Sequence, residues 1–459
     1  MQCLIAFALL LAIAANEWPS PFVGVTDTHR VWAVVLVQTL LSALAGCGCD
    51  RLGPGPSNPI RTWFPILCWL AGSLIVTLGL GWSQWVANHY GMIDVGSAVL
   101  ILVPHLASLV VVWAVPLALG EGRSKSGTRP SMTDRWRVIG SHLRVRFQWQ
   151  LLPILLPLLT VLIARDLLER SVLWQQLNWT MQVGVLAGAS MLIVLLGFPY
   201  LIKCWLPTKP FADPDFQRCV DDAGARLGLN LRESVEWQTQ MKIANALVLG
   251  WLPGTRRILI SDVLCWALTP RQRFAVFLHE AGHLKRHHLW WRLSVIVLAA
   301  EVLLLGSIAS QPELNWANPQ ESFRVFLATL GLLGLMLLTA LLMGLVSRAL
   351  EFEADAFVLE YDRGTPSSEL EPKSLSLNLP DDLIAAIRCT ADLTGTPLTH
   401  VTWMHPSIAE RIERLRFCHA SPILRKLVQR RLRVLKGMLL GSILLLASLL
   451  ALHGLVWTI

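Results

Sequence analysis

The sequence predicts a mainly α-helical, polytopic membrane protein with about nine transmembrane helices and one folded domain on the cytoplasmic side. Three observations lead to this prediction. The composition is 54% hydrophobic and only 15% charged, with a mean hydropathy of +0.53, whereas a soluble domain carries about 25% charged residues. Long apolar runs recur along the chain. The Lys and Arg residues gather in alternate loops between these runs.

A transmembrane helix needs about 20 mostly apolar residues. The runs that approach this length cover residues 3–16, 31–47, 63–82, 97–119, 150–165, 183–206, 292–310, 324–347 and 434–457. The run 150–165 is the weakest, because it is short and contains two prolines. The run 3–16 could instead be a signal peptide with a cleavage site after Ala14 and Ala15. The lack of a basic segment before it favours a retained helix.

The distribution of basic residues predicts the orientation. If the first run begins in the cytoplasm and the runs alternate, the cytoplasmic loops hold 34 Lys and Arg residues and the opposite loops hold two. This bias is the positive-inside rule. We therefore attribute the net charge of +8 to membrane orientation and expect no nucleic-acid partner. The expected location is a bacterial inner membrane, with the large loops in the cytoplasm.

The same runs divide the chain. Residues 1–206 form an N-terminal membrane region of about six helices, residues 293–347 a transmembrane hairpin, and residues 434–459 a C-terminal helix. Residues 207–292 and 348–433 together have the size of one domain, so we interpret them as two halves of a cytoplasmic domain that the hairpin interrupts. Within the second half, the stretch 363–381 is rich in Ser, Pro and acidic residues and predicts a flexible insertion.

The first half contains the motif H-E-x-x-H, formed by His279, Glu280 and His283. The preceding residues 269–272 (TPRQ) have the pattern of a capping box with proline at the first helical position, so we expect the motif on a helix. Histidines at i and i+4 share one helix face and can hold one zinc ion. Glu280 lies beside them, where it can take a proton from a zinc-bound water.

A catalytic zinc ion needs a third protein ligand. His287 is about 12 Å from His279 along a continuous helix, which is too far for both to bind one ion. We expect His287 and His288 to lie at the lipid boundary instead. Better candidates follow the hairpin, where Glu351 and Asp355 share a helix face. One can ligate zinc and the other can accept a hydrogen bond from a ligand histidine. The alternative is an ordinary charged helix that leaves the membrane.

Four blocks of the sequence carry a resemblance to a known family. They are Asn245-Ala246, Leu278–His283, Arg348–Asp355, and Met404–Ser407 followed by Arg411-Ile412. With these blocks, over roughly residues 205–420, the chain resembles the HtpX and CAAX-prenyl-endopeptidase family of integral membrane zinc metallopeptidases, which are gluzincins. The resemblance implies that the cytoplasmic domain, split by the hairpin, is a gluzincin-like α+β metalloprotease domain.

The resemblance also implies roles for single residues. His279, His283 and Glu351 would hold one zinc ion, with Asp355 as the acid behind a ligand histidine. Glu280 would be the general base of peptide-bond hydrolysis.

Further positions take their roles from the same resemblance. His405 or Arg411 would stabilise the oxyanion, and Asn245 and Ala246 would bind substrate. Residues 243–249 could form an edge strand that pairs with an extended substrate, or a core strand. The expected substrates are membrane-associated or misfolded proteins.

Two other functions remain open from the sequence. The antibiotic-sensing membrane transducers are also gluzincins, but they usually end the third-ligand block with Cys-Asp, where this chain has Ala354-Asp355. A membrane scaffold that keeps zinc for stability is the second alternative. The presence of Glu280 argues against it, because a structural zinc site needs no base. The sequence leaves the physiological substrate and the oligomeric state open.

Overall fold

The computed structural model describes residues 27–51, 59–90, 95–120, 132–169, 171–177, 206–250, 252–309, 319–364 and 378–456, with a few residues of 5–13 and 181–189. The chain divides into two compact units, Met1–Leu201 and Ile202–Ile459. The predicted span 183–206 and the predicted insertion 363–381 lie largely outside the described residues, as does the span 3–16.

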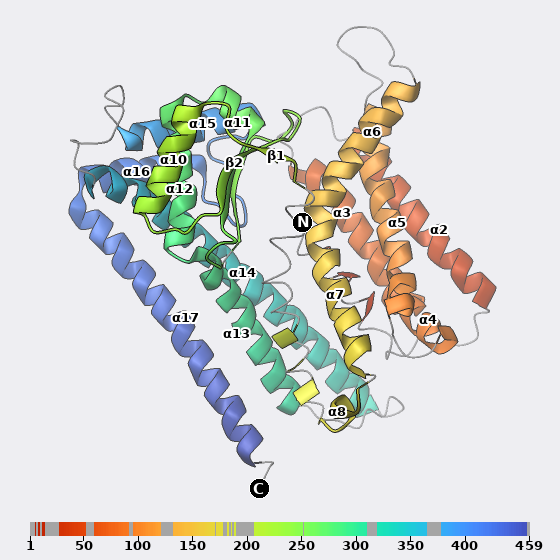
Figure 1. Cartoon of the computed structure of the whole chain (residues 1–459). Helices are drawn as coiled ribbons and strands as arrows, with labels where there is room; N and C mark the ends of the chain where they lie inside the picture. Colours follow the sequence, from red (N-terminus) through yellow and green to blue (C-terminus); the bar gives the residue numbers. More distant parts are fainter. Residues whose placement is uncertain are drawn as a thin grey trace. The chain divides into compact units, whose positions relative to one another are not determined.

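The first unit is a helical bundle (Figure 1). Its helices are α2 (Asp27–Arg51), α3 (Pro59–Leu74), α4 (Trp82–Tyr90), α5 (Val95–Gly120), α6 (Met132–Arg146), α7 (Leu152–Glu169) and α8 (Val172–Gln175), with π-helical turns at Ile75–Gly79 and Phe147–Leu151. Helix α2 packs against α3 and α5. The core between α3 and α5 contains Trp69, whose indole N–H donates to the carbonyl of His105 at 2.9 Å.

Several of the described helices have the apolar composition of membrane spans. Among the described residues, Val95–Val115 and Arg425–Leu452 are long and apolar enough to cross a bilayer. The bent pair Phe64–Thr77 and Trp82–Tyr90 would add a third span if it crosses as one unit. Helices also cover most of the other described runs. The nine-span topology itself stays a prediction.

The second unit contains a four-stranded sheet in the order β1-β2-β4-β3. The strands are β1 (Thr208–Lys209), β2 (Glu233–Trp237), β3 (Ala246–Leu249) and β4 (Arg257–Ser261). The central strand β4 is buried along its whole length, runs parallel to β2 and pairs antiparallel with β3. Strand β3 therefore lies at the edge of the sheet. This decides between the edge and the core alternatives for residues 243–249.

Eight helices of the second unit are described: α10 (Pro214–Arg226), α11 (Asp262–Ala267), α12 (Pro270–Lys285), α13 (His288–Ala309), α14 (Pro319–Gly364), α15 (Leu379–Thr394), α16 (Ile408–Ala420) and α17 (Pro422–Val456). Helix α12 is central, since it packs against β3 and β4 as well as α14 and α15. Its side chains Phe277, Leu278 and Ala281 are fully buried in the core. Helices α13, α14 and α17 extend away from the sheet (Figure 1). Helix α14 continues unbroken across the predicted domain boundary at residue 347.

The predicted start of α12 is confirmed. Thr269 Oγ1 accepts a hydrogen bond from the backbone N–H of Gln272, and the Gln272 side chain accepts one from the backbone N–H of Thr269. We expect Thr269→Ala to lower the free energy of unfolding by about 0.5–2 kcal/mol, because the first turn of the helix loses its cap. Thermal unfolding of the solubilised protein measures this loss. Thr269→Ser is the control and should keep wild-type stability; equal stability of both variants would contradict the role of the cap.

Candidate active site

Helices α12 and α14 approach closely at Gly282. A Cβ atom at this position would lie 3.1 Å from Cβ of Phe357 and 3.3 Å from Cα of Ala354. Both separations are too short for a relaxed contact, so a larger residue would push the helices apart. The glycine inside the H-E-x-x-H motif thus lets the acidic segment of α14 lie directly against the histidines of α12.

The structure brings the three predicted metal ligands together. The potential ligand atoms of His279, His283 and Glu351 all lie within 4.8 Å of one another. The Nε2 atoms of the two histidines are 3.3 Å apart, and each is 3.6 Å from a Glu351 carboxylate oxygen. Two imidazoles and one carboxylate are a donor set of catalytic zinc sites. In the part of the chain that the structure describes, no other group of three such side chains could hold a metal ion.

Asp355 fixes the ring of His279. Its Oδ1 lies 2.9 Å from Nδ1 of His279, so the Nδ1–H donates to the carboxylate and Nε2 is left for a metal ion. Burial lowers the pKa of His279, but hydrogen bonds to Asp355 and Glu351 outweigh it and raise the pKa to about 9. Arg411 donates two hydrogen bonds to Asp355, at 2.9 and 2.6 Å.

Glu351 is surrounded by donors. Its Oε1 accepts a hydrogen bond from Arg292 at 3.2 Å and lies 3.4 Å from Nδ1 of His405. Burial raises the pKa of this carboxyl, but His279 and His405 outweigh the effect and hold the pKa well below its usual range. The side chain is therefore a carboxylate, the form that a metal ligand requires. Sequence reasoning missed Arg292, because an arginine after two tryptophans has the pattern of a membrane-interface anchor.

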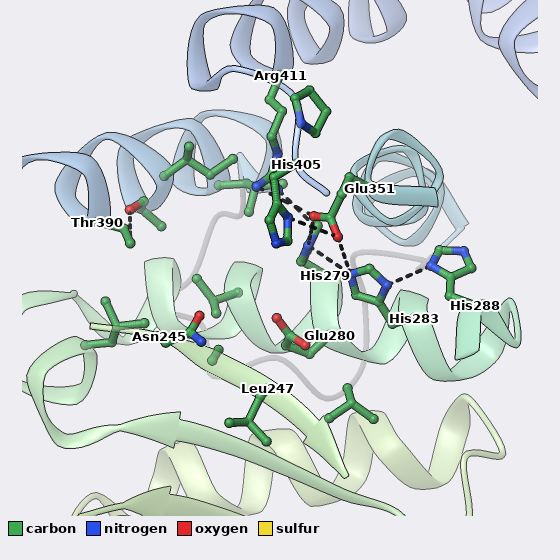
Figure 2. A pocket seen from close by; sticks show the side chains of 18 of the residues that line it. Asn245, Leu247, His279, Glu280, His283, His288, Glu351, Thr390, His405 and Arg411 are labelled. Carbon is green, nitrogen blue, oxygen red and sulfur yellow. Dashed lines mark hydrogen bonds and ion pairs between the residues drawn. The ribbon is translucent and has the colours of Figure 1, made fainter. Parts of the chain in front are cut away.

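An open cleft of about 500 Å³ adjoins the ligand cluster and is bounded by β3, α12, α15 and the chain before α16. Figure 2 shows Glu280, Asn245 and Leu247 on one side of this cleft and Glu351 and His405 on the other. Glu280 is half-buried, and burial raises the pKa of its carboxyl above the usual value. A carboxylate with a raised pKa beside a metal site is suited to proton transfer.

Comparison with known proteins assigns part of the chain to a family. Residues 210–418 match the family model of Peptidase family M48. These residues are an M48 peptidase domain. The crystal structure of S. mikatae Ste24p overlaps with the chain at a TM-score of 0.46 and 13% sequence identity, over 89% of this chain and 99% of that chain. No curated protein matches the chain. By its M48 domain, the protein is a metalloendopeptidase.

Strand β3 lines the cleft of the M48 domain. Residue Asn245, just before it, pairs with Ser261 through its backbone: its N–H donates to Ser261 Oγ at 3.1 Å, and its carbonyl accepts from the N–H of Ser261 at 3.0 Å. Ala246 follows as the first residue of the strand and also lines the cleft. Within the described residues, β3 pairs only with β4, so one edge of the strand has no partner strand.

His405 and Arg411 both line the cleft but differ in their contacts. The ring of His405 is more than half exposed, and a hydrogen bond of 2.9 Å from its backbone N–H to Thr402 Oγ1 holds the loop. Arg411 is half-buried against Asp355, and the carboxylates of Asp355 and Glu351 raise the pKa of its guanidinium although burial lowers it. The ring of His405 is therefore accessible from the cleft, whereas the guanidinium of Arg411 is held by carboxylates of the site.

The expectation that His288 lies at the lipid boundary is wrong. Helix α12 ends at Lys285, and His287 has a positive φ of 55°, which reverses the chain before α13 begins at His288. The side chain of His288 is buried as a result, and its Nδ1 lies 2.7 Å from Nδ1 of His283. His287, by contrast, is exposed. A left-handed residue at 287 is a local feature that apolar periodicity does not reveal.

Proposed function

We propose that the protein is an integral membrane zinc endopeptidase that cleaves membrane-associated or misfolded proteins. The observation that carries this proposal is the meeting of His279, His283 and Glu351 beside Glu280 in an open cleft. A site that only stabilises the fold would need neither an acid next to the ligands nor access for a substrate.

The residues fit a zinc ion. Zinc prefers imidazole nitrogen and carboxylate oxygen in a four-coordinate site, and a catalytic site keeps one position open. Here His279, His283 and Glu351 would hold the ion, and the far nitrogen of each histidine already has a hydrogen-bond partner. Zinc bound there supplies Lewis acidity, which makes water acidic near neutral pH and polarises a carbonyl group.

The protein's own residues would move the protons. Glu280 would accept a proton from the attacking water and pass it to the leaving amine, as a general acid–base catalyst does. His405, with its exposed ring at the cleft, would donate a hydrogen bond to the developing oxyanion. Because the two shortest hydrogen bonds from Arg411 go to Asp355, we assign Arg411 the task of fixing Asp355 and, through it, His279.

The free edge of β3 suggests how a substrate would bind. An extended segment could add to this edge as a further strand, with Asn245 and Ala246 at its start. Such pairing reads the backbone rather than the side chains. It would favour substrates whose chain is locally unfolded, which matches misfolded or partly extracted membrane proteins. The direct test is whether cleavage of an unfolded protein depends on bound zinc.

We further propose that the M48 domain faces the cytoplasm, on the basis of the 34-to-2 distribution of Lys and Arg. We expect single cysteines introduced in 363–381 and in 311–323 to react from opposite sides of the membrane. Labelling of intact and permeabilised cells with an impermeant thiol reagent measures this. The single cysteines are introduced into a protein whose natural cysteines are replaced, and that protein without an introduced cysteine is the control that should not be labelled. Labelling of both sites from the same side would contradict the hairpin of residues 293–347.

A further inference from the structure

We propose that His283 is positioned by a chain of three side chains, His288, Glu353 and Lys436, which ends on the C-terminal helix α17. The inference rests on the proposed function, because it takes His283 as a zinc ligand. It assigns a role to three residues outside the ligand set and connects the metal site to α17.

The three contacts are short and continuous. Nδ1 of His288 lies 2.7 Å from Nδ1 of His283, and Nε2 of His288 lies 2.8 Å from Oε2 of Glu353. Nζ of Lys436 lies 2.7 Å from the same oxygen of Glu353. His288 is only 1% exposed, so water does not compete for its ring nitrogens. Figure 2 shows the dashed contact between His288 and His283 on the side of the His283 ring away from the ligand cluster.

The hydrogen bonds between these side chains can all be donated in one direction, from His283 through His288 to Glu353. Nε2 of His283 faces His279 and Glu351, so a neutral His283 that offers Nε2 to a metal carries its proton on Nδ1. That N–H donates to Nδ1 of His288. His288 must then carry its own proton on Nε2 and donate it to Glu353, which also accepts from Lys436. The chain thus fixes the tautomer of His283 that metal binding requires.

The fold holds each member in place. The reversal at His287 returns His288 to His283, and Glu353 lies on α14, whose segment around Leu350 packs with α13 and α17. On α17, the ammonium group of Lys436 lies 5.2 Å from the ring centroid of Trp291. Cation–π contact at this distance restrains the lysine.

The two ligand histidines are therefore held in parallel ways. His279 donates to Asp355, which is paired with Arg411. His283 contacts His288, which in turn contacts an equivalent ion pair, Glu353 and Lys436. Loss of a residue that orients a metal ligand typically weakens metal affinity by about 10–100-fold.

The test measures the zinc dissociation constant of the full-length protein by competition with a chelator of known affinity. We expect His288→Leu, Glu353→Gln and Lys436→Met each to weaken zinc binding, and His288→Leu by about 10–100-fold. His288→Asn keeps an acceptor for the His283 N–H and should recover part of the loss. The absorption spectrum of the Co²⁺-substituted protein should shift in His288→Leu, because the ring of His283 turns.

Matched controls are His287→Asn, which tolerates the positive φ, and Lys426→Met on the exposed side of α17. Both should bind zinc as the wild type does. Wild-type dissociation constants and an unchanged cobalt spectrum in Glu353→Gln and Lys436→Met would overturn the inference, even if His288→Leu failed to fold. If the wild type binds zinc and these variants bind it equally well, the positioning role is refuted but the proposed zinc peptidase function stands. If the wild type binds no zinc, the positioning role and the proposed function are both refuted.

Discussion

Glu280→Gln is expected to abolish proteolysis while the protein keeps its fold and its zinc. Glutamine has nearly the same size and helix propensity as glutamate, but it cannot accept the proton of the attacking water. General acid–base catalysis contributes about 10²–10⁴ to a rate, so the loss should be of that order. Zinc content should stay at the wild-type level, because His279, His283 and Glu351 do not need residue 280 for ligation.

Cleavage of an unfolded substrate and elemental analysis should be measured on the same preparations. Glu413→Gln, an exposed position on α16, is the matched control and should cleave like the wild type. A Glu280→Gln protein that is folded, holds zinc and cleaves at the wild-type rate would show that Glu280 is not the base.

Glu351→Ala is expected to remove most of the bound zinc. The substitution takes away one of three ligands, and it also removes the carboxylate that accepts the hydrogen bond of Arg292 beside the two histidines. The positive charge of Arg292, no longer balanced there, disfavours a dication at the same place. Elemental analysis should show about one zinc per chain for the wild type and far less for Glu351→Ala. His279→Ala, which removes another ligand, should lose zinc in the same way.

Glu413→Ala serves as the control for Glu351→Ala and should retain zinc. Thermal unfolding in the presence of chelator separates loss of metal from loss of fold. If Glu351→Ala keeps its full zinc content, the third ligand lies elsewhere.

The sequence predicts those features of the site that depend on residues close together on one helix. The pairing of His279 with His283 follows from spacing on one helix, and the cap at Thr269 marks where that helix begins. Glu351 and Asp355 are visible as one face of another helix. Their separate roles came from the resemblance rather than from spacing, and the structure places Glu351 against both imidazoles and Asp355 behind His279.

The remaining contacts depend on tertiary structure. His288 reaches His283 only because residue 287 adopts a left-handed conformation. Arg292 and Lys436 lie at the starts of the apolar runs 292–310 and 434–457, where basic residues ordinarily mark a membrane interface. Neither periodicity nor composition distinguishes such an anchor from a partner of a buried carboxylate, since that depends on how α13 and α17 pack against α14.

A zinc titration of cleavage tests whether one zinc ion per chain makes the protein a peptidase. The protein is stripped with a chelator, reloaded with measured amounts of zinc, and assayed on an unfolded membrane-protein substrate. We predict that the stripped protein is inactive and that activity rises in proportion to added zinc until about one ion per chain is bound. Equal cleavage by the stripped and the reloaded protein, or no cleavage by the fully loaded protein, would show that the protein is not a zinc-dependent peptidase.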